Sequence, residues 1–321
     1  MSLKNKSILV TGGAGFIGSH LVDRIIKEEP EKIVVVDNFF LGKQRNLKSA
    51  KEKYPILKIE YKDASDINAM RGILEMESID IVFNLAVIPL LTSHDEPKMT
   101  WDVNVNTTMV LCELLKKKHY LTLIHFSSSE AYGNGEKIPM DEEHPLNPTT
   151  PYAASKAAGD HLVTSYNKTF GIDASIIRPF NNYGPRQNEG SYAGVIPITI
   201  KRILRGLPPI VHGDGEQTRD YIFVANTAEA AIDIYKHKNT RGKILNIASG
   251  EEITVNKIIA TIAEILEYDK PFIHEPKRLA DVRRHKGDIS LAKKLIDFEP
   301  KIGFEEGIRE TIEWYKNNIM I

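Results

Sequence analysis

The sequence lacks the features that mark several classes of protein. Its one cysteine, Cys112, cannot form an internal disulfide, and its place in an apolar helical pattern predicts a buried side chain. The 42 basic and 43 acidic residues leave a net charge near −1, which gives no support to binding of nucleic acid or of a membrane surface. No apolar run is long enough to cross a membrane.

Two further absences bear on location and on metals. The N-terminus runs from a short Lys/Asn segment into a predicted strand, without the apolar core of a signal peptide, so we expect a cytoplasmic protein. The ten histidines do not have the spacing of metal ligands, and Asp141-Glu-Glu-His144 lies in a turn-rich segment. We therefore expect no metal site.

What is present is an alternation of apolar strands and amphipathic helices. The runs 33–36 and 81–83 are apolar without a polar alternate, as expected of strands that helices cover on both faces. The alternation predicts an α/β fold with a Rossmann-type doubly wound parallel sheet. Predicted strands are 7–11, 33–36, 57–61, 79–85, 121–126 and 174–178, and predicted helices end near Lys27 or span 67–75, 97–117 and 151–170.

The pattern changes after Arg178, where a loop rich in proline, glycine and asparagine covers 179–192. Short strands near Ile210 and Tyr221 follow, among helices at about 195–204, 225–236, 255–266 and in 291–321. We expect residues 1–180 to form a dinucleotide-binding domain, to which later segments can return, and residues 181–321 to form a smaller mixed α/β lobe that binds substrate. A long loop at such a junction is a usual place for a substrate pocket.

A glycine-rich turn follows the first predicted strand. Gly12, Gly15 and Gly18 lie between this strand and a helix, in the context of a dinucleotide-binding motif. Small residues there let the backbone approach a pyrophosphate, and the helix N-terminus offers N–H groups. Asp37, at the end of the second strand, would accept hydrogen bonds from a ribose diol and repel a 2′-phosphate. NAD is therefore favoured over NADP, although Lys43 and Arg45 follow closely.

Two clusters of polar residues are candidates for catalysis. Tyr152 and Lys156 are four residues apart in a predicted helix, so their side chains lie on one face, one turn apart. A lysine ammonium beside a phenol favours the phenolate, which can then act as a base near neutral pH. Ser127-Ser-Ser-Glu130 follows the fifth strand, at the edge of the sheet where α/β folds place active sites.

These motifs together resemble those of the extended short-chain dehydrogenase/reductases, and within them the NAD-dependent nucleotide-sugar epimerases, dehydratases and decarboxylases. The resemblance covers essentially the whole chain. The segments that carry it are Thr11-Gly-Gly-Ala-Gly-Phe-Ile-Gly18, the serine cluster, Tyr152-Ala-Ala-Ser-Lys156, Arg178-Pro-Phe-Asn-Asn-Tyr-Gly-Pro-Arg186, Asp214-Gly-Glu-Gln-Thr-Arg-Asp-Tyr221 and Asp281-Val-Arg283.

The resemblance implies a role for many residues. The implied catalytic residues are Ser128, Ser129, Glu130, Tyr152 and Lys156. The implied cofactor-binding residues are Gly12, Gly15, Phe16, Ile17, Gly18, Asp37, Asn38, Asp63, Ala64, Leu85, Ala86, Asn104, Tyr152, Lys156 and Pro179, with Asp63 and Ala64 beside the adenine. The implied substrate-binding residues are Ser128, Asn181, Arg186, Val195, Arg219 and Arg283, with arginines suited to a diphosphate. The family also implies a homodimer built on the helices at 97–117 and 152–170.

Members of this family begin alike, by oxidising C4 of the sugar, and then diverge into 4-epimerisation, 4,6-dehydration or decarboxylation. Glu130 discriminates between them, because epimerisation needs no base near C5. If the segment were extended, Glu130 and Ser128 would share one face of it. The chain departs from many dehydratases at Ser129, where those enzymes carry an aspartate as an acid. Glu130 would then have to move the C5 proton to the C6 oxygen itself.

The predicted substrate loop argues against decarboxylation and is more like that of 4-epimerases. Decarboxylases of the family usually carry an arginine after a loop glycine, whereas Ser191 follows Gly190 in this chain. The loop 187–197 looks more like that of certain 4-epimerases of N-acetylated or uronic UDP-sugars. Because the catalytic residues bear on the reaction more directly than the loop does, we predict a 4,6-dehydratase acting on a UDP- or dTDP-hexose. A 4-epimerase is the alternative, and a decarboxylase is the third possibility. A non-catalytic NAD-binding protein would be favoured if Tyr152 or Lys156 were missing, and both are present.

Overall fold

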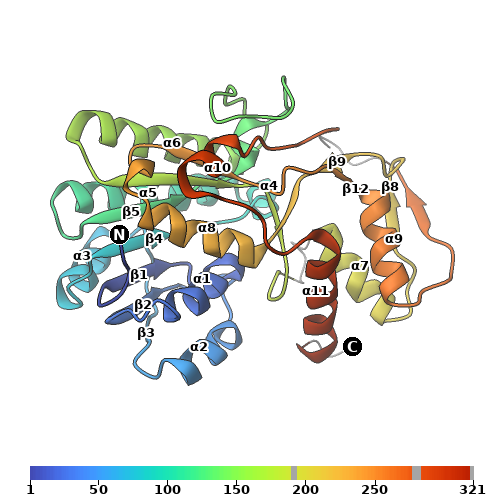
Figure 1. Cartoon of the computed structure of the whole chain (residues 1–321), viewed down its shortest axis with the longest axis horizontal. Coiled ribbons are helices and arrows are strands. Elements are labelled where there is room, and N and C mark those ends of the chain that lie inside the picture. Colours follow the sequence, from blue (N-terminus) through green and yellow to red (C-terminus); the bar gives the residue numbers. More distant parts are fainter. Residues whose placement is uncertain (189–193, 277–282, 319–321) are drawn as a thin grey trace.

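The computed structural model describes residues 1–188, 194–276 and 283–318. The chain forms two lobes, and Figure 1 shows the larger one, with the N-terminus, on the left and the smaller one on the right. Within the described ranges, no helix is long and apolar enough to cross a membrane.

A parallel sheet, with seven strands in the described part of the chain, forms the centre of the large lobe. Its order is β11-β6-β5-β4-β1-β2-β3, and all neighbours are parallel. Since β1 lies between β2 and β4, the strand order reverses there, and the carboxyl edge at such a reversal is where α/β folds bind ligands. The predicted Rossmann-type sheet is confirmed. Its strands are β1 (Ser7–Thr11), β2 (Lys32–Val36), β3 (Lys58–Glu60), β4 (Ile81–Asn84), β5 (Thr122–Phe126), β6 (Ala174–Pro179) and β11 (Ile244–Ile247).

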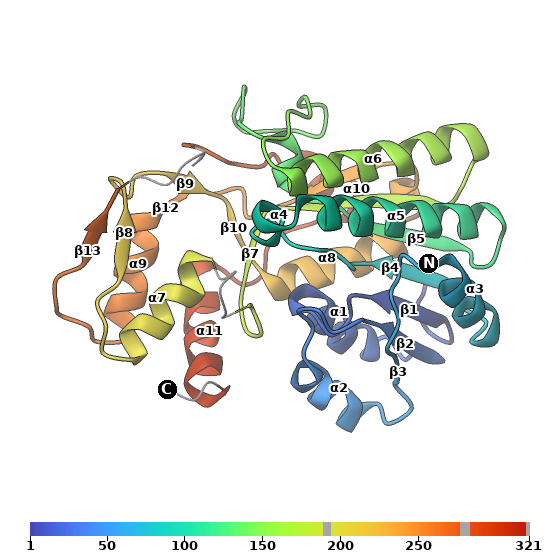
Figure 2. The same ribbon diagram turned by 180° about the vertical axis from the view of Figure 1, so that it is seen from behind.

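Helices cover both faces of this sheet, and successive strand residues serve opposite cores. In β1, Ile8 and Val10 pack into the core that α1 and α8 share, whereas Leu9 packs into the core of α3 and α5. Figure 2 shows α5 and α6 side by side along one face. These helices are α1 (Phe16–Ile26), α3 (Ile67–Met76), α5 (Pro97–Lys116), α6 (Pro151–Phe170) and α8 (Val224–Lys236), with the shorter η1 (Gln44–Leu47), α2 (Lys48–Lys53), α4 (Thr92–Asp95), η3 (Lys238–Thr240) and α10 (Ser290–Ile296).

The chain returns to the large lobe after the small lobe has begun. β11 joins the sheet beside β6, and α8 packs against α1. The sequence pattern predicts α8 but misses β11, a strand of four residues that contains the polar Asn246. Asn246 is fully buried because its amide is satisfied: it accepts from the Tyr132 hydroxyl and donates to the carbonyl oxygen of Met140.

In the described residues, the small lobe has its own apolar core and three short strand pairs. Ile200, Ile258 and Ile312 bring three helices together in that core. The strand β7 lies within the stretch 179–192 that the sequence predicts as a loop, so that prediction is wrong at 181–183, where β7 pairs with β10. The elements are helices α7 (Val195–Leu204), α9 (Val255–Ile265) and α11 (Phe304–Asn318), and pairs β7 (Asn181–Tyr183) with β10 (Tyr221–Phe223), β9 (Thr218–Arg219) with β12 (Ile253–Thr254), and β8 (Ile210–His212) with β13 (Ile273–Glu275).

A buried ion pair fastens α6 to the sheet. The Arg178 guanidinium on β6 donates to one carboxylate oxygen of Asp160 on α6, from Nη2 at 2.6 Å and from Nε at 3.1 Å. Both side chains are at most 2% exposed, and the guanidinium also lies over the Tyr132 ring. Because Asp160 is one helical turn from Lys156, this pair fixes the part of α6 that carries the predicted catalytic residues.

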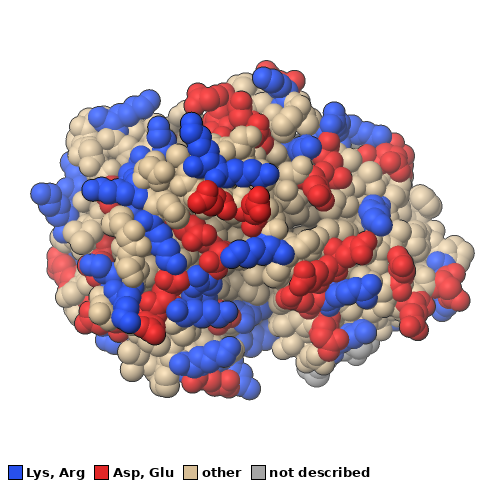
Figure 3. All heavy atoms as spheres, viewed as in Figure 1, with Lys and Arg blue, Asp and Glu red and all other residues tan. Residues whose placement is uncertain are grey.

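Charges of both signs are interspersed on the face that Figure 3 shows. This agrees with a net charge near −1. Attraction of an anionic substrate must then come from charges within the site rather than from the long-range field of this face.

The ion pair yields a prediction about stability. Arg178→Met leaves the Asp160 carboxylate buried without its partner, which typically costs about 3–5 kcal/mol of unfolding free energy. Lys98→Ala removes an exposed pair with Asp102 on α5 and should cost less than about 1 kcal/mol. Urea unfolding of both variants measures the difference. Equal losses would contradict the role of the buried pair.

Candidate active site

The glycine-rich turn approaches the neighbouring strand end so closely that side chains would not fit. Gly12 has φ +65°, and a Cβ there would come 2.8 Å from the backbone of Leu85 and Ala86. A Cβ on Gly18 would come 2.2 Å from the Gly12 carbonyl oxygen. Gly15 is the N-cap of α1 and has no side chain to cap the free N–H groups of the helix. These groups are therefore left for an anion, as the motif predicts.

Asp37 ties the turn to the end of β2. Its Oδ2 accepts from the Ala14 N–H at 2.9 Å and its Oδ1 from the Phe39 N–H at 2.8 Å. Burial raises the pKa of Asp37, and these two hydrogen bonds oppose the rise. Each carboxylate oxygen still has lone pairs for a ribose hydroxyl.

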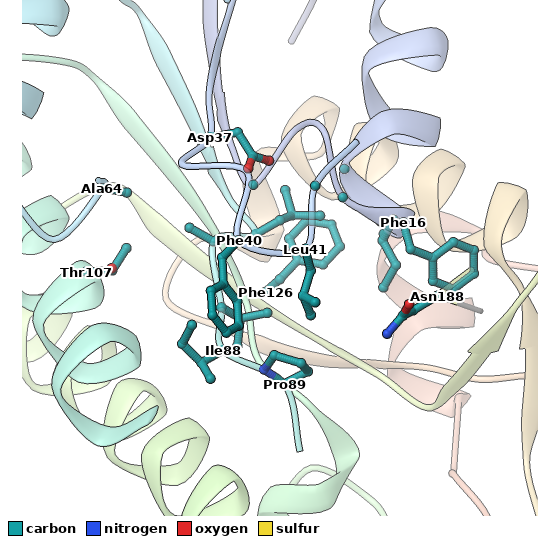
Figure 4. A pocket seen from close by; sticks show the side chains of 18 of the residues that line it. Phe16, Asp37, Phe40, Leu41, Ala64, Ile88, Pro89, Thr107, Phe126 and Asn188 are labelled. Carbon is teal, nitrogen blue, oxygen red and sulfur yellow. The ribbon is translucent and has the colours of Figure 1, made fainter. Parts of the chain in front are cut away.

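A cavity of about 390 Å³ runs along the carboxyl edge of the sheet, past the glycine turn and Asp37 (Figure 4). Its volume is in the range of small-molecule sites. Nearly all the residues predicted to bind the cofactor line it, together with Ser128 and Arg186. Those cofactor residues are Gly12, Gly15, Phe16, Ile17, Gly18, Asp37, Asn38, Asp63, Ala64, Leu85, Ala86, Tyr152, Lys156 and Pro179.

Asn104 does not line the cavity but braces its wall. From α5, its Oδ1 accepts from the Ile88 N–H at 2.7 Å, and its Nδ2 donates to the Ile88 carbonyl oxygen and to the Ser155 hydroxyl. Ser155 precedes Lys156 on α6. One buried amide thus joins α5, α6 and the segment after β4.

Tyr152 and Lys156 both line the cavity, from the first turns of α6. The Thr150 hydroxyl caps this helix by accepting from the Ala153 N–H, and Pro151 occupies its first turn. The Lys156 ammonium donates to the carbonyl oxygen of Phe126, at the end of β5. α6 and β5 therefore hold the pair at the edge where α/β folds place chemistry.

Without a cofactor, the protein does not favour the Tyr152 phenolate. Burial raises the pKa of Tyr152 to about 12; a hydrogen bond with Ser128 lowers it, and the nearby Glu130 carboxylate raises it further. Burial lowers the pKa of Lys156 to about 8, against the opposing effect of Asp160. Lys156 is not among the groups that shift the pKa of Tyr152 in this structure, where burial has the largest effect. That Lys156 and the positive ring of bound NAD together lower this pKa stays a prediction.

The serine cluster is a turn rather than an extended segment, so that expectation is wrong. Ser128 caps a 3₁₀ helix, η2 (Ser129–Tyr132), and its hydroxyl accepts from the Glu130 N–H at 3.2 Å. A serine hydroxyl at such a position accepts a hydrogen bond from a nearby backbone N–H and so starts a helical turn. Ser128 and Glu130 nevertheless both act on Tyr152, as the pKa effects above show. Ser129 is buried beside them.

Glu130 faces a cation of the small lobe. Burial raises the pKa of the Glu130 carboxyl, and Arg219 on β9 opposes the rise. A partly buried carboxyl of raised pKa, beside a tyrosine and an arginine, is suited to taking up and returning a proton.

The other predicted substrate residues differ in how they are held. Asn181 donates to the carbonyl oxygen of Asp220, and Val195 begins α7. Arg186 pairs with Asp23 of α1 at 2.6 Å, which holds the loop after β7 against the glycine-turn helix. Arg283 is half exposed and bonded to both carboxylate oxygens of Asp214. Parts of the predicted loop 187–197, including Gly190 and Ser191, and Asp281 lie outside the described residues.

Two residues that were given no role from the sequence support the site. His285 is buried beside Ser129 and Arg219, its ring centroid 5.1 Å from that of Phe180, and burial lowers its pKa to about 4. Asp220, fully buried next to Arg219, accepts from the backbone N–H groups of Ser249, Gly250 and Gly287. Both positions depend on contacts far apart in the chain, so no local pattern could reveal them.

The model of the GDP-mannose 4,6 dehydratase family matches residues 9–311. The chain is 34% identical over 314 residues to a UDP-glucose 4-epimerase of Mycolicibacterium smegmatis, covering 96% of this chain and 98% of that protein.

Solved structures that share the fold include an epimerase and a dehydratase. One is a UDP-N-acetylglucosamine 4-epimerase from Methanobrevibacter ruminantium in complex with UDP-N-acetylmuramic acid, with TM-score 0.91 and 35% identity, covering 98% of this chain and 100% of that one. The other is a dTDP-glucose 4,6-dehydratase from Bacillus anthracis in complex with NAD, with TM-score 0.87 and 31% identity, covering 98% and 97%. The tight glycine turn, Asp37 and the cavity fit NAD as the cofactor of this chain.

Proposed function

This chain belongs to the GDP-mannose 4,6 dehydratase family of NAD-dependent nucleotide-sugar epimerases and dehydratases, and on that premise we propose that it is a 4,6-dehydratase. Its substrate is a UDP- or dTDP-hexose. The products are the 4-keto-6-deoxy sugar nucleotide and water, so the reaction needs no external oxidant or reductant.

The position of Glu130 carries this proposal. Its carboxylate is close enough to Tyr152 to raise the pKa of the phenol, and burial raises its own pKa. Tyr152 acts at C4 of the sugar, so a group beside it is placed for the adjacent C5 proton. Epimerisation at C4 leaves that proton untouched and has no use for such a base.

Tyr152, Ser128 and Lys156 have separate roles in the first step, the oxidation of C4. Tyr152 takes the proton of the sugar 4-hydroxyl, while Ser128, already hydrogen-bonded to the phenol, shares the developing charge. The Lys156 ammonium is held by its hydrogen bond to the carbonyl oxygen of Phe126. Bound NAD would supply the acceptor for the C4 hydride and, in its positive ring, the charge that stabilises the phenolate.

The elimination then falls to Glu130. The new 4-ketone acidifies the C5 proton, which Glu130 takes, and the same carboxyl returns a proton to the C6 oxygen as it leaves as water. Ser129 cannot supply that proton, because a serine hydroxyl is far too weak an acid at neutral pH. A raised pKa lets Glu130 serve both as base and as acid. A hydride, which bound NADH would return, then adds to C6, and C5 takes a proton from solvent. Tyr152 releases the 4-hydroxyl proton to solvent, which completes the balance.

A 4-epimerase is the second candidate. It is supported by the similarity to the two epimerases above, at 34% and 35% identity over nearly the whole chain. An epimerase would use Tyr152, Ser128 and Lys156 in the same way, and Glu130 would then only balance Arg219.

Product analysis tests the proposal. Purified protein with NAD is incubated with UDP-, dTDP- and GDP-hexoses, and the products are separated and weighed by mass spectrometry. A 4,6-dehydratase gives a product lighter by one water. An isobaric 4-epimer without a dehydrated species contradicts the proposal, and so does loss of carbon dioxide from a uronic sugar.

Glu130→Gln separates the two steps. This variant should still oxidise C4 and reduce bound NAD, which is followed by absorbance, but it should stop exchange of the C5 proton with deuterium oxide. Glu142→Gln is the matched control, since burial also raises the pKa of Glu142, which accepts from the Asn246 N–H instead. It should keep exchange. Unchanged turnover of Glu130→Gln would assign Glu130 to structure.

We also propose that the chain forms a homodimer through α5 and α6. Trp101, Met109 and Phe170 are exposed apolar side chains on these helices, and a partner would cover them. Sedimentation velocity should then show twice the mass of 36.2 kDa. Trp101→Asp should shift the protein towards monomer, whereas Ile56→Asp, at an exposed apolar residue elsewhere, should not. A monomeric wild type would contradict the proposal.

A further inference from the structure

A carboxylate that the proposed reaction does not use is buried where the two lobes meet. Asp220 lies between β9 and β10 and is fully buried. Its Oδ1 accepts from the N–H and the hydroxyl of Ser249, both at 2.7 Å, and its Oδ2 from the N–H groups of Gly250 at 3.0 Å and Gly287 at 3.3 Å. Burial raises the pKa of Asp220 to about 6, and these bonds oppose the rise, so the group is ionised at neutral pH. Bonds to an ionised acceptor are stronger than bonds between neutral groups.

The donors to this carboxylate belong to segments of the large lobe. Ser249 and Gly250 follow β11 at the carboxyl edge of the sheet. The chain neighbours of Gly287 are bonded through their backbone to Met140, which packs in the core of the large lobe. A Cβ on Gly287 would come 2.8 Å from the ring of Phe180, so only glycine fits there. The carboxylate therefore ties the segment between β9 and β10 to two segments of the large lobe.

The backbone of Asp220 in turn holds two predicted substrate residues. Its carbonyl oxygen accepts from the backbone N–H of Asn181 at 3.1 Å and from the Asn181 side-chain amide at 3.3 Å. Its own N–H donates to the carbonyl oxygen of His285 at 2.9 Å. Arg219 directly precedes it and pairs with Ile253 between β9 and β12. The positions of Asn181 and Arg219 relative to the sheet thus depend on Asp220.

Arg219 lies next to the catalytic groups. The carboxylate of Glu130 interacts electrostatically with both Arg219 and Tyr152, and Tyr152 lines the cavity. In a nucleotide sugar the diphosphate is attached to the hexose, so a substrate with its hexose at Tyr152 brings two anionic phosphates close to this cation. A guanidinium binds phosphate oxygens well only when its planar group is correctly oriented.

We infer that Asp220 is a positioning residue for substrate binding: it holds Arg219 and Asn181 where they can bind the diphosphate of the nucleotide sugar beside η2. Asp220 itself contacts neither sugar nor cofactor and acts through these two residues. The inference rests on the proposed nucleotide-sugar substrate, but it does not depend on which reaction follows the oxidation of C4.

Asp220→Asn tests the inference by binding. The variant keeps the shape of the side chain, but whichever way the amide turns, its NH₂ group faces a backbone N–H that needs an acceptor. Calorimetric titration with UDP and with dTDP should show binding about 10-fold weaker than in the wild type, as expected when a charge-assisted hydrogen bond is lost. Affinity for NAD should stay within about 2-fold, because Asp220 does not line the cofactor cavity. In steady-state kinetics the KM for the nucleotide sugar should rise by the same factor as the UDP dissociation constant, with little change in kcat.

Ser249→Ala provides a milder form of the same test. It removes one donor to Asp220, the hydroxyl, and leaves the three N–H donors in place. This variant should fold even if Asp220→Asn does not, and it should weaken UDP binding by about 2- to 3-fold. UDP affinity equal to that of the wild type in both variants, or in Ser249→Ala when Asp220→Asn does not fold, would overturn the inference.

Asn226→Ala is the matched control. The buried side chain of Asn226 on α8 also accepts from two backbone N–H groups, those of Lys301 at 3.1 Å and Ile302 at 3.2 Å, in the segment that leads to α11. Its loss should destabilise the fold but leave UDP binding as in the wild type. An equal loss of UDP affinity in Asn226→Ala and Asp220→Asn, or an equal loss of UDP and NAD affinity in Asp220→Asn, would show a general loosening of the fold and overturn the inference.

The wild-type titrations separate this inference from the proposed function. A wild type that binds none of UDP, dTDP and GDP would contradict the proposed substrate class, and the inference with it. A wild type that binds UDP or dTDP no more tightly than Asp220→Asn does would contradict the inference alone.

Discussion

The position of α6 on the sheet is the constraint on which the site depends. Three buried polar contacts set it: the ion pair of Asp160 with Arg178, the hydrogen bond of Lys156 to Phe126, and that of Ser155 with Asn104. Each joins the helix to a different element. Because buried polar groups that lose a partner are costly, a small displacement of α6 would break several of them together. The geometry of Tyr152 and Lys156 is therefore a property of the packed lobe rather than of the helix alone.

The same burial that fixes these groups also sets their proton affinities. The protein alone holds Tyr152 protonated, with a pKa near 12, and Lys156 near 8. Positive charge brought in with the cofactor would lower the first value, since an opposite charge nearby favours the ionised form. We therefore expect binding of the dinucleotide to favour the phenolate form of Tyr152. Glu130 interacts electrostatically with both lobes, since its carboxylate raises the pKa of Tyr152 and Arg219 opposes the rise in its own pKa.

Local patterns in the sequence predicted much of this arrangement. Gly12, Gly18 and Asp37 are close in sequence to the elements they serve, and Tyr152 and Lys156 share one helix, so spacing was enough. The Ser128 cap was missed because a serine at a strand end can either continue the strand or cap a 3₁₀ turn, and the sequence does not show which backbone group its hydroxyl will bond. Contacts between distant segments were also out of reach.

His285 beside Ser129 and the pairing of Arg186 with Asp23 illustrate that limit. Arg186 was assigned to the substrate from its motif, and its contact with α1 appears only when the lobes are assembled. The burial of Asn246 in β11 was missed for the same reason. A polar residue in a short apolar run does not indicate a strand until its hydrogen-bond partners are known.

The fate of the hydride distinguishes dehydration from epimerisation most directly. The nucleotide hexose that the enzyme converts is prepared with deuterium at C4, and the product is examined by NMR. A 4,6-dehydratase moves the label from C4 to the new methyl group at C6, as the account predicts. Label found again at C4, in a sugar that keeps its 6-hydroxyl, would contradict it.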